Sequence, residues 1–361
     1  MPSQSIVQSI NHKVHQQLIP AVPKKWIHQF SFGLQAYGLR PFQSAAGNAR
    51  MTILKPSTAL RKAERLFNNT QLTDQLGSIF DGLDLVRPGS FVSVDHSDMN
   101  QLTALVGAIQ TRKGRSIPCF IETTYSDRIP SDCSGRSTPR KASLRAARAQ
   151  ARRTQSFTGH TIDALQDFAD RLGFWPKLVF DRGFGNESII EHLHSQEATF
   201  YIRMKAGRYV QLTDPGTGVA HRIEIKELTQ KDATVELFGL TLRVIRSPKN
   251  RRALEPWYIL TNDMVSSRDR VVRIYYYRFE IEETFKDVKH IFEFRRTRLN
   301  KPNSLKLILW FISIGIALLY QATKPTQASL YAPHTKKRTS WLRQAYEQLR
   351  AETTQLLWGG A

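Results

Sequence analysis

Apolar residues in the first part of the chain follow a helical spacing. Residues 1–87 carry short amphipathic patterns such as TALRKAERLFNNTQLTDQLGSIF, with breaks at Pro20, Pro23, Pro41 and Pro56. This pattern predicts a small all-α domain. Because basic residues outnumber acidic residues in this part of the chain, we expect a DNA-binding domain, with a helical packing or dimerisation module as the alternative.

In the next part of the chain, short apolar runs alternate with a helical pattern. A β-branched run that ends at Asp95 precedes two strands joined by a basic turn at residues 112–115, which predicts a three-stranded meander. A helical pattern over residues 157–175 then leads to an apolar strand that ends at Asp181. We therefore expect residues 88–205 to form the first part of an α/β domain.

The last part of the chain contains an insertion, two helices and a tail. Residues 206–262 alternate in short runs separated by DPGTG and SPKNRR, which predicts an all-β insertion. Residues 263–325 complete the α/β domain with one long helix, capped near Ser266 or Ser267, and with the apolar run LKLILWFISIGIALLY. This run is shorter than the roughly 20 residues that cross a bilayer, so we expect a buried core helix rather than a membrane segment. A basic tail, residues 326–361, ends the chain.

The composition narrows the class of protein. The chain has 361 residues and a net charge of +21, which favours a polyanionic partner because basic groups near phosphates release condensed counterions. A hydrophobic content of 41% excludes a disordered basic tail. Two cysteines exclude a disulfide framework and fit a reducing compartment, and the first residues lack a secretory signal pattern. We therefore expect a cytoplasmic, nucleoid-associated protein.

One basic segment stands out within the α/β domain. Residues 136–153 hold seven basic residues and no acidic residue, and the spacing from Leu144 onwards suits a helix. We expect this basic arm to contact phosphates, while a solvated charged linker is the alternative. The arginines that we expect to touch DNA are Arg145, Arg148 and Arg152.

Three acidic residues stand out by their positions. Asp95 and Asp181 end predicted strands, and Glu282 lies in the middle of the long helix. A carboxylate at the end of a buried strand is costly unless it has a partner, and oxygen ligands of this kind suit Mg²⁺. Two such ions activate a water or a 3′-hydroxyl in phosphodiester chemistry. A meander, a helix and a strand that ends in an acid predict a ribonuclease-H-like mixed sheet flanked by helices.

The long helix carries a second chemical pattern. At about 100° per residue, four residues at relative positions 0, +3, +7 and +14 lie within a sector of about 60°. Their side chains are an aromatic ring, a guanidinium, a carboxylate and an ammonium, a mixture that suits a metal-bound phosphate. A solvent-exposed helix face with ion pairs is the alternative. The four residues are Tyr275, Arg278, Glu282 and Lys289.

The spacing Y-x2-R-x3-E-x6-K of these four residues resembles the signature of the insertion-sequence-four family of DDE transposases. The run VFDRGFG around Asp181 is similar to the second-aspartate motif of that family, and FVSVDHSD around Asp95 is similar to its first. The all-β insertion, with WYILTND at its exit, is also similar to the family. The resemblance covers residues 88–322.

The resemblance implies cut-and-paste transposition of an insertion sequence. In this reaction water attacks the phosphodiester at each transposon end, and the freed 3′-hydroxyl then attacks the opposite strand, giving a hairpin, and later the target DNA. Asp95, Asp181 and Glu282 are expected to be the catalytic residues and to hold two Mg²⁺ ions, with Mn²⁺ as a substitute. Double-stranded DNA is the expected partner, and a two-ended substrate favours a homodimer.

The resemblance also implies DNA contacts for several side chains. Arg278 and Lys289 are expected to grip phosphates near the terminal nucleotide, and Tyr275 the region of the 5′ phosphate. Arg182, next to the second aspartate, is a further expected contact. An aromatic residue of the insertion is expected to trap a flipped base, with Trp257 as the first candidate and Tyr209 and Phe238 as the others.

Other functions share part of this pattern. Another ribonuclease-H-like nuclease, for instance a resolvase, would share the acids but would not need the other three signature residues on one helix face. A catalytically inactive DNA-binding transposition inhibitor would not need the acids. A membrane-associated basic protein would depend on the apolar run near the end of the chain.

Overall fold

The structure is a computed structural model. It describes residues 5–39, 55–99, 102–125, 157–213, 216–247, 256–291, 299, 301–323 and 340–358. The chain folds into two compact units. Unit 1 consists of Met1–Val86, His96–Cys133 and Phe279–Ala361, and unit 2 consists of Arg87–Asp95 and Ser134–Arg278.

The N-terminal part of unit 1 is helical, as the sequence predicts. Pro20 lies in a short helical turn, and Pro56 occupies the first turn of a helix, where a missing N–H costs little. Asn69 caps the helix that follows, because its side chain accepts a hydrogen bond from the backbone of Leu72. The elements are α1 (Ile6–Lys13), η1 (Val14–Leu18), η2 (Ile19–Ala21), η3 (Lys24–Trp26), α2 (Ile27–Gly33), η4 (Leu34–Gly38), α4 (Pro56–Phe67) and α5 (Thr70–Asp81).

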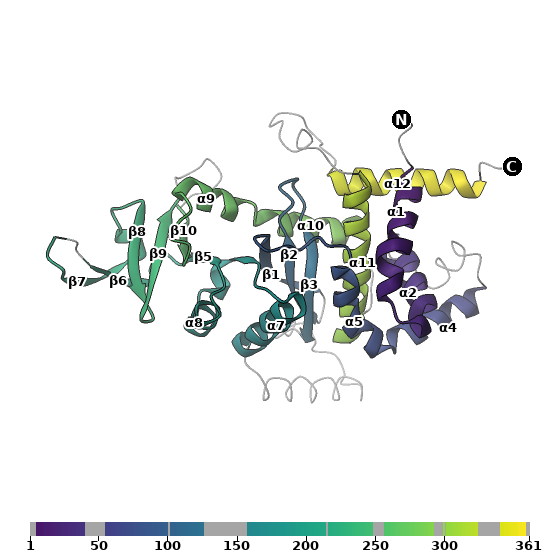
Figure 1. The fold of residues 1–361 in the computed structure, drawn as a ribbon, viewed down its shortest axis with the longest axis horizontal. Helices are drawn as coiled ribbons and strands as arrows, with labels where there is room; N and C mark the ends of the chain where they lie inside the picture. Colours follow the sequence, from purple (N-terminus) through teal and green to yellow (C-terminus); the bar gives the residue numbers. More distant parts are fainter. Residues whose placement is uncertain are drawn as a thin grey trace, which may run out of the picture. The chain divides into compact units, whose positions relative to one another are not determined.

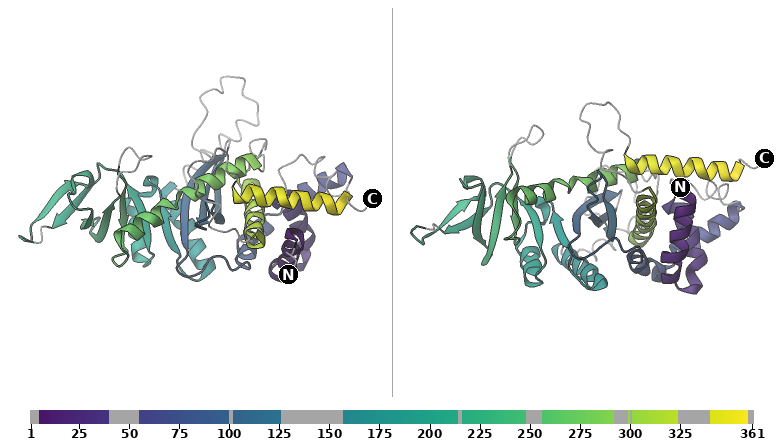
Figure 2. Two further views of the ribbon diagram at one scale, coloured as in Figure 1. Left: turned by 90° about the horizontal axis from the view of Figure 1, so that it is seen from above. Right: turned by 45° about the horizontal axis from the view of Figure 1, so that its top comes forward.

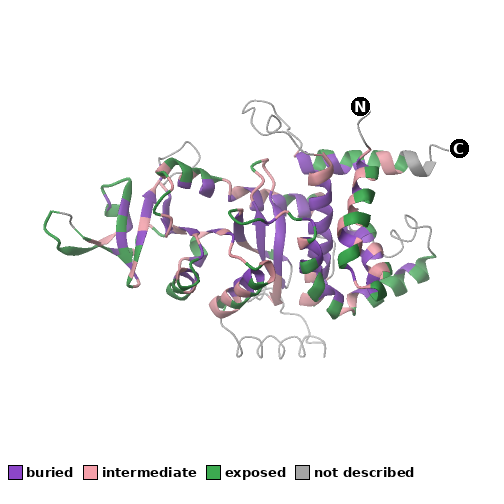
Figure 3. Ribbon diagram, viewed as in Figure 1, coloured by how far each residue is buried: buried purple, intermediate pink, exposed green. Residues whose placement is uncertain are grey.

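The apolar helix α11 (Pro302–Thr323) is the core of unit 1. It contacts α1, η4 and α5 from the N-terminal part, together with strand β3 (Ile117–Tyr125) (Figure 1). Its side chains are buried along most of its length, as Figure 3 shows. Within its apolar run, residues 305–320, Lys306 pairs with Glu122 of β3 and Ser313 donates to the carbonyl of Pro118 of β3. The prediction of a buried core helix is confirmed.

By length and composition alone, α11 is also the one helix of the described residues that is apolar enough to cross a membrane. The protein buries 78% of the apolar window of this helix. This degree of burial is typical of the core helix of a folded domain.

Glycines allow α11 to approach the N-terminal helices closely. A Cβ atom on Gly315 would lie 1.8 Å from the carbonyl oxygen of Gly38, and a Cβ atom on Gly33 would lie 2.3 Å from the Phe311 ring. Larger residues therefore do not fit at this crossing. The N-terminal helices are consequently part of the same packed core as α11.

Three further elements complete unit 1. Strand β2 (Leu102–Ile109) pairs antiparallel with β3 across the basic turn that the sequence predicts. Helix α10 (Phe279–Ile291) contacts β3 and the C-terminal helix α12 (Trp341–Trp358). Helix α12 also contacts one end of α11, as the views in Figure 2 show (Figure 2).

Unit 2 is built on a large mixed sheet. In this unit the strands follow the order β1-β4-β5-β10-β9-β8-β6-β7. The pairs β1–β4 and β4–β5 are parallel, and the remaining pairs are antiparallel. The strands are β1 (Phe91–Met99), which passes into unit 1 after Asp95, β4 (Lys177–Phe180), β5 (Phe200–Met204), β6 (Tyr209–Thr213), β7 (Ala220–Glu224), β8 (Asp232–Leu237), β9 (Leu240–Arg246) and β10 (Tyr258–Thr261).

Helices flank this sheet. Helix α7 (Phe157–Leu172) packs beside α8 (Glu187–Ser195), and α9 (Arg268–Tyr276) contacts β9 and β10. Short helical turns η5 (Arg182–Phe184) and η6 (Ile225–Glu227) connect strands. The chain is thus a mixed α/β protein with a large mixed sheet flanked by helices, which is consistent with the predicted ribonuclease-H-like fold.

Two predictions about individual elements are wrong. Asp95 lies in the middle of β1 rather than at its end, because β1 continues to Met99. The predicted long helix is divided into α9 and α10 by a turn at Tyr277 and Arg278, in which Arg278 donates its backbone N–H to Tyr275. The tertiary contacts of α9 with β9 and β10, and those of α10 with β3 and α12, override the continuous helical pattern.

The domain boundaries expected from the sequence stay predictions. The N-terminal helices belong to the same compact unit as α11, α12 and the β2–β3 hairpin. The strands of residues 209–246 come between β5 and β10 in the chain, where the all-β insertion is expected, and they lie beyond β10 in the sheet.

Candidate active site

Two of the predicted acids lie next to each other in the sheet of unit 2. The parallel register of β1 and β4 ends with Val94 opposite Phe180, and Asp95 and Asp181 follow directly. Neighbouring strands are separated by about 4.8 Å, so the two carboxylates emerge at the same edge from adjacent strands. The Asp95 side chain is 20% exposed, and Asp181, which precedes η5, is half-buried.

A buried arginine accompanies the first aspartate. The Arg278 guanidinium lies 3.3 Å from the Asp95 carboxylate, and its side chain is 4% exposed. It also lies 5.7 Å from the centre of the Tyr275 ring. This ion pair stabilises a carboxylate that would otherwise be costly to place at a buried strand.

Two buried aromatic residues, Tyr275 and Trp257, pack next to the Arg278–Asp95 ion pair. Tyr275 is fully buried, and the two rings lie 5.3 Å apart in an edge-to-face arrangement. Burial raises the pKa of Tyr275 to about 12, and the negative charge of Asp181 acts in the same direction, while Arg278 and Arg203 oppose it. Tyr275 is therefore a neutral phenol at physiological pH.

The remaining signature residues lie in unit 1. Glu282 and Lys289 are both half-buried on α10, and their separation of seven residues places them on one face of that helix. The structure thus places Asp95, Asp181, Tyr275, Arg278 and Trp257 in unit 2, and Glu282 and Lys289 in unit 1.

The donor set at the two strands fits a hard divalent cation. Asp95 and Asp181 supply carboxylate oxygens from adjacent strands, and Mg²⁺ is usually held by one or two carboxylates together with substrate phosphates. Within the described ranges, no group of three or more His, Cys, Asp and Glu side chains forms a complete metal site.

The other predicted DNA contacts fall into two groups. Arg182 is exposed on η5, directly after Asp181. Arg145, Arg148 and Arg152 lie outside the described residues, as does the whole basic arm at residues 136–153.

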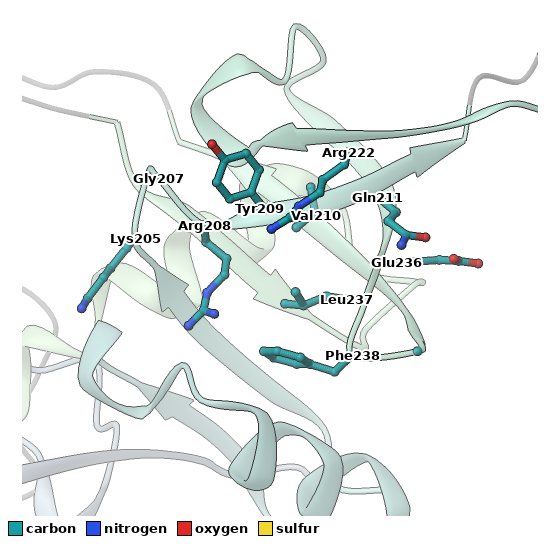
Figure 4. A pocket seen from close by; sticks show the side chains of 11 residues that line it. Lys205, Gly207, Arg208, Tyr209, Val210, Gln211, Arg222, Glu236, Leu237 and Phe238 are labelled. Carbon is teal, nitrogen blue, oxygen red and sulfur yellow. The ribbon is translucent and has the colours of Figure 1, made fainter.

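The strands of the insertion form a basic cavity of about 750 Å³ (Figure 4). Arg222 lies 4.7 Å from the Tyr209 ring, and Arg208 lies 5.7 Å from the Phe238 ring, so two guanidinium–aromatic pairs face the cavity. Arg208 also donates to the carbonyl of Gly185, in the loop that follows Asp181. The sequence predictions include the two aromatic residues as candidates but miss the two arginines, because the sequence alone does not show that Arg208, before β6, and Arg222, in β7, face one cavity.

The sequence predictions also miss Glu280. Its side chain is buried and accepts backbone hydrogen bonds from the turn between β2 and β3. Burial raises the pKa of Glu280 to about 7, although these N–H groups act in the opposite direction. The sequence offers one signal, an acid close to a predicted catalytic residue, but it does not show which turn this acid would meet.

Fold and site together define an α/β protein with two carboxylates at adjacent parallel strands. Residues 154–319 match the family model described as a transposase DDE domain. The match includes Asp181 and all four signature residues, so this part of the chain is similar to transposase DDE domains. Domains of this kind generally depend on divalent metal ions. No curated protein matches the chain.

Proposed function

We propose that the protein is a DDE transposase of the insertion-sequence-four family, which moves its element by cut-and-paste transposition. The observation that carries this proposal is the register of β1 and β4, which ends directly before Asp95 and Asp181, together with the match of residues 154–319 to a transposase domain. A resolvase or an inactive DNA-binding inhibitor would share the fold, but would not need the spacing of Tyr275, Arg278, Glu282 and Lys289 together with the two aspartates.

Asp95, Asp181 and Glu282 are the proposed ligands of two Mg²⁺ ions, for which Mn²⁺ can substitute. Such ions, when bound, activate the attacking water or 3′-hydroxyl and stabilise the leaving oxygen. Asp95 lies in β1 and Asp181 directly follows β4, so both are attached to paired strands rather than to a long loop. Rigid elements hold catalytic groups more accurately than loops do.

Arg278, Lys289, Tyr275 and Arg182 are the proposed contacts to the DNA backbone near the terminal nucleotide. Arg278 lies against Asp95, so in this position its charge is close to the reacting phosphodiester. A guanidinium forms two parallel hydrogen bonds to a phosphate, whereas Lys289 supplies a point charge. Arg182 is exposed and is therefore accessible to DNA without rearrangement.

The basic cavity of the insertion is the proposed place for a flipped base. Trp257 is only 7% exposed and packs on Tyr275, whereas Tyr209 is 46% exposed and borders the cavity. Stacking on an aromatic ring stabilises an unpaired base by about 1–3 kcal/mol. Exposure therefore favours Tyr209 and Phe238 over Trp257 for this role.

The proposed partners are double-stranded transposon ends and target DNA, held by a homodimer in the DNA complex. The N-terminal helices and the basic arm at residues 136–153 are the proposed accessory DNA contacts, and the proposed location is cytoplasmic and nucleoid-associated. The high net positive charge supports the proposed DNA contacts, because each phosphate contact adds to the salt-dependent part of the affinity.

The decisive experiment is the substitution Glu282→Gln in the full chain. The substrate is a supercoiled plasmid that carries the coding sequence with its natural flanking DNA, incubated with Mg²⁺. We expect loss of end cleavage with retained end binding, because the substitution removes one charged ligand and keeps the shape of the side chain. Glu283→Gln, on the same helix, is the matched control and should cleave normally.

Two results would contradict the proposal. Normal cleavage by the Glu282→Gln variant would exclude this residue as a metal ligand. Binding of the ends without any cleavage by the unmodified protein would instead indicate an inactive DNA-binding protein.

A further inference from the structure

One face of α10 is fixed to the rest of unit 1 by polar contacts. Glu280, Thr284 and Asp287 are spaced by four and three residues, so they lie on the same side of the helix. All three are buried, and all three bond to the segment between β2 and β3. We call these three residues the anchor face.

The strongest contact of the anchor face is a carboxylate held by backbone N–H groups. Glu280 accepts hydrogen bonds from the backbone nitrogens of Thr111, Arg112 and Gly114, at 2.9, 3.1 and 2.7 Å. Arg112 and Gly114 have φ angles of 59° and 85°, the left-handed conformation that turns successive N–H groups toward one anion. Because Arg112 is a non-glycine residue, this backbone conformation is sustained by the surrounding contacts.

The other two anchor residues extend the same attachment. Thr284 accepts a hydrogen bond of 2.9 Å from the backbone of Ser116. Asp287 accepts from the Arg115 side chain and from the Ser340 hydroxyl, both at 2.7 Å, and Ser340 directly precedes α12. The anchor face therefore joins α10 to the hairpin turn and to the start of α12.

Glu282 lies on the opposite side of the same helix. At about 100° per residue, Glu282 and Lys289 lie about 200° and 180° away from Glu280. The contacts of the anchor face thus determine how α10 is rotated about its axis and where the Glu282 carboxylate lies. With side chains reaching about 5–6 Å from the axis, a rotation of about 10° moves that carboxylate by about 1 Å.

We propose that Glu280 is a positioning residue for Glu282: its buried carboxylate, held by the turn at residues 111–114, sets the rotation of α10 so that Glu282 presents its oxygens to a divalent cation. This inference rests on the proposed function, in which Glu282 is a metal ligand. A displacement of about 1 Å in a reacting group costs about a hundredfold in rate. A residue that orients a metal ligand typically contributes 10–100-fold to metal affinity.

The test compares Glu280→Gln with Glu283→Gln in the full chain. Gln keeps the shape of Glu280 but presents an N–H donor to the N–H groups of the turn. Glu283 is 41% exposed, and its ion pairs with Lys286 and, at 3.6 Å, with Arg115 are of the exposed kind that contributes little. The first readout is Mn²⁺ affinity, measured by electron paramagnetic resonance of the free ion. The second readout is the Mg²⁺ concentration that gives half-maximal end cleavage.

For Glu280→Gln we expect the Mn²⁺ affinity to fall about tenfold and the half-maximal Mg²⁺ concentration to rise about tenfold, with unchanged binding of the DNA ends. For Glu283→Gln we expect no change in the Mn²⁺ affinity or in the half-maximal Mg²⁺ concentration. Thr284→Val removes a second anchor contact and keeps the side-chain shape, and it should change the Mn²⁺ affinity and the half-maximal Mg²⁺ concentration in the same directions. If Glu280→Gln does not fold, Thr284→Val tests the inference in its place. Unchanged Mn²⁺ affinity in a folded anchor variant would overturn the inference.

The same titration separates this inference from the proposed function. If Glu282→Gln binds Mn²⁺ as tightly as the unmodified protein, Glu282 is not a ligand and the proposed function fails. If only Glu282→Gln loses affinity, the metal site stands and the positioning role of Glu280 fails.

Discussion

The close approach of Gly315 on α11 to the backbone of Gly38 on η4 allows the loss of stability on substitution to be predicted from distances. Replacing Gly315 by alanine adds one methyl group at the crossing with η4. That Cβ atom would lie 1.8 Å from the carbonyl oxygen of Gly38, 2.6 Å from its carbonyl carbon and 3.1 Å from its Cα atom. Cβ atoms essentially never lie closer than 3.0 Å to such neighbours, so the crossing must open by more than about 1 Å. A backbone carbonyl cannot turn aside as a flexible side chain can.

The expected loss of stability follows from two opposing effects. Overpacking a well-packed core costs about 1–3 kcal/mol, and a clash with backbone belongs at the upper end. Alanine is a better helix former than glycine by about 1 kcal/mol, which offsets part of this cost. We therefore expect Gly315→Ala to lower the free energy of unfolding by about 2 kcal/mol.

Urea unfolding followed by circular dichroism measures this change, and hydrogen exchange of peptides from α11 and η4 shows whether it arises in unit 1. Gly207→Ala is the control, because the nearest atom to its added Cβ is 3.9 Å away. An unfolding midpoint for Gly315→Ala equal to that of the unmodified protein would show that α11 and η4 do not pack as described.

Three further predictions concern charged residues. Burial acts to raise the pKa of Asp263, but hydrogen bonds from Ser266, the Tyr201 hydroxyl and the backbone of Val265 together outweigh it and hold this pKa well below its usual range. The ionised carboxylate stabilises the fold above the unfolded pKa of about 3.9, and this stabilisation is lost as pH falls through the lower pKa of the folded state. Asp263→Asn should therefore lower the free energy of unfolding by about 1 kcal/mol at neutral pH. The difference in Tm between the variant and the unmodified protein should shrink toward pH 3. A double-mutant cycle of Asp95→Asn and Arg278→Met should show a coupling free energy of about 1–3 kcal/mol in urea unfolding, and independent effects would argue against the ion pair. Finally, neutralising the basic arm should flatten the salt dependence of DNA binding by up to about 0.9 in the log–log slope for each residue, whereas an unchanged slope would exclude phosphate contacts by Arg145, Arg148 and Arg152.

Much of the fold follows from local patterns in the sequence. The apolar run of α11 predicts a buried helix because nearly every position is apolar, and its two polar exceptions find partners on β3. The basic turn at residues 112–115 predicts the hairpin of β2 and β3. The grouping of the N-terminal helices with α11 was not predictable, because it depends on glycines whose role appears only when two distant segments cross.

The site shows the same division between local and tertiary information. The ends of two apolar runs draw attention to Asp95 and Asp181, and both residues directly follow the last paired positions of β1 and β4, although β1 itself continues beyond Asp95. The break at Tyr277 and Arg278 was missed, because no proline or glycine marks it and the helical pattern continues through it. Glu280 was missed because its partners are backbone N–H groups, which leave no mark in a sequence.

The break in the helix changes how the signature spacing is understood. On a continuous helix, Tyr275, Arg278, Glu282 and Lys289 would form a single polar face. In the structure the first two are fixed by contacts with Trp257 and Asp95, and the last two lie on a helix that is fixed by the anchor face. A substitution that disturbs the first set should therefore alter the Asp95 ion pair without changing the rotation of α10, and a substitution in the anchor face should do the reverse. In this chain the position of each side chain is therefore set by its own environment, and the spacing in sequence follows from the short turn at Tyr277 and Arg278 that joins α9 to α10.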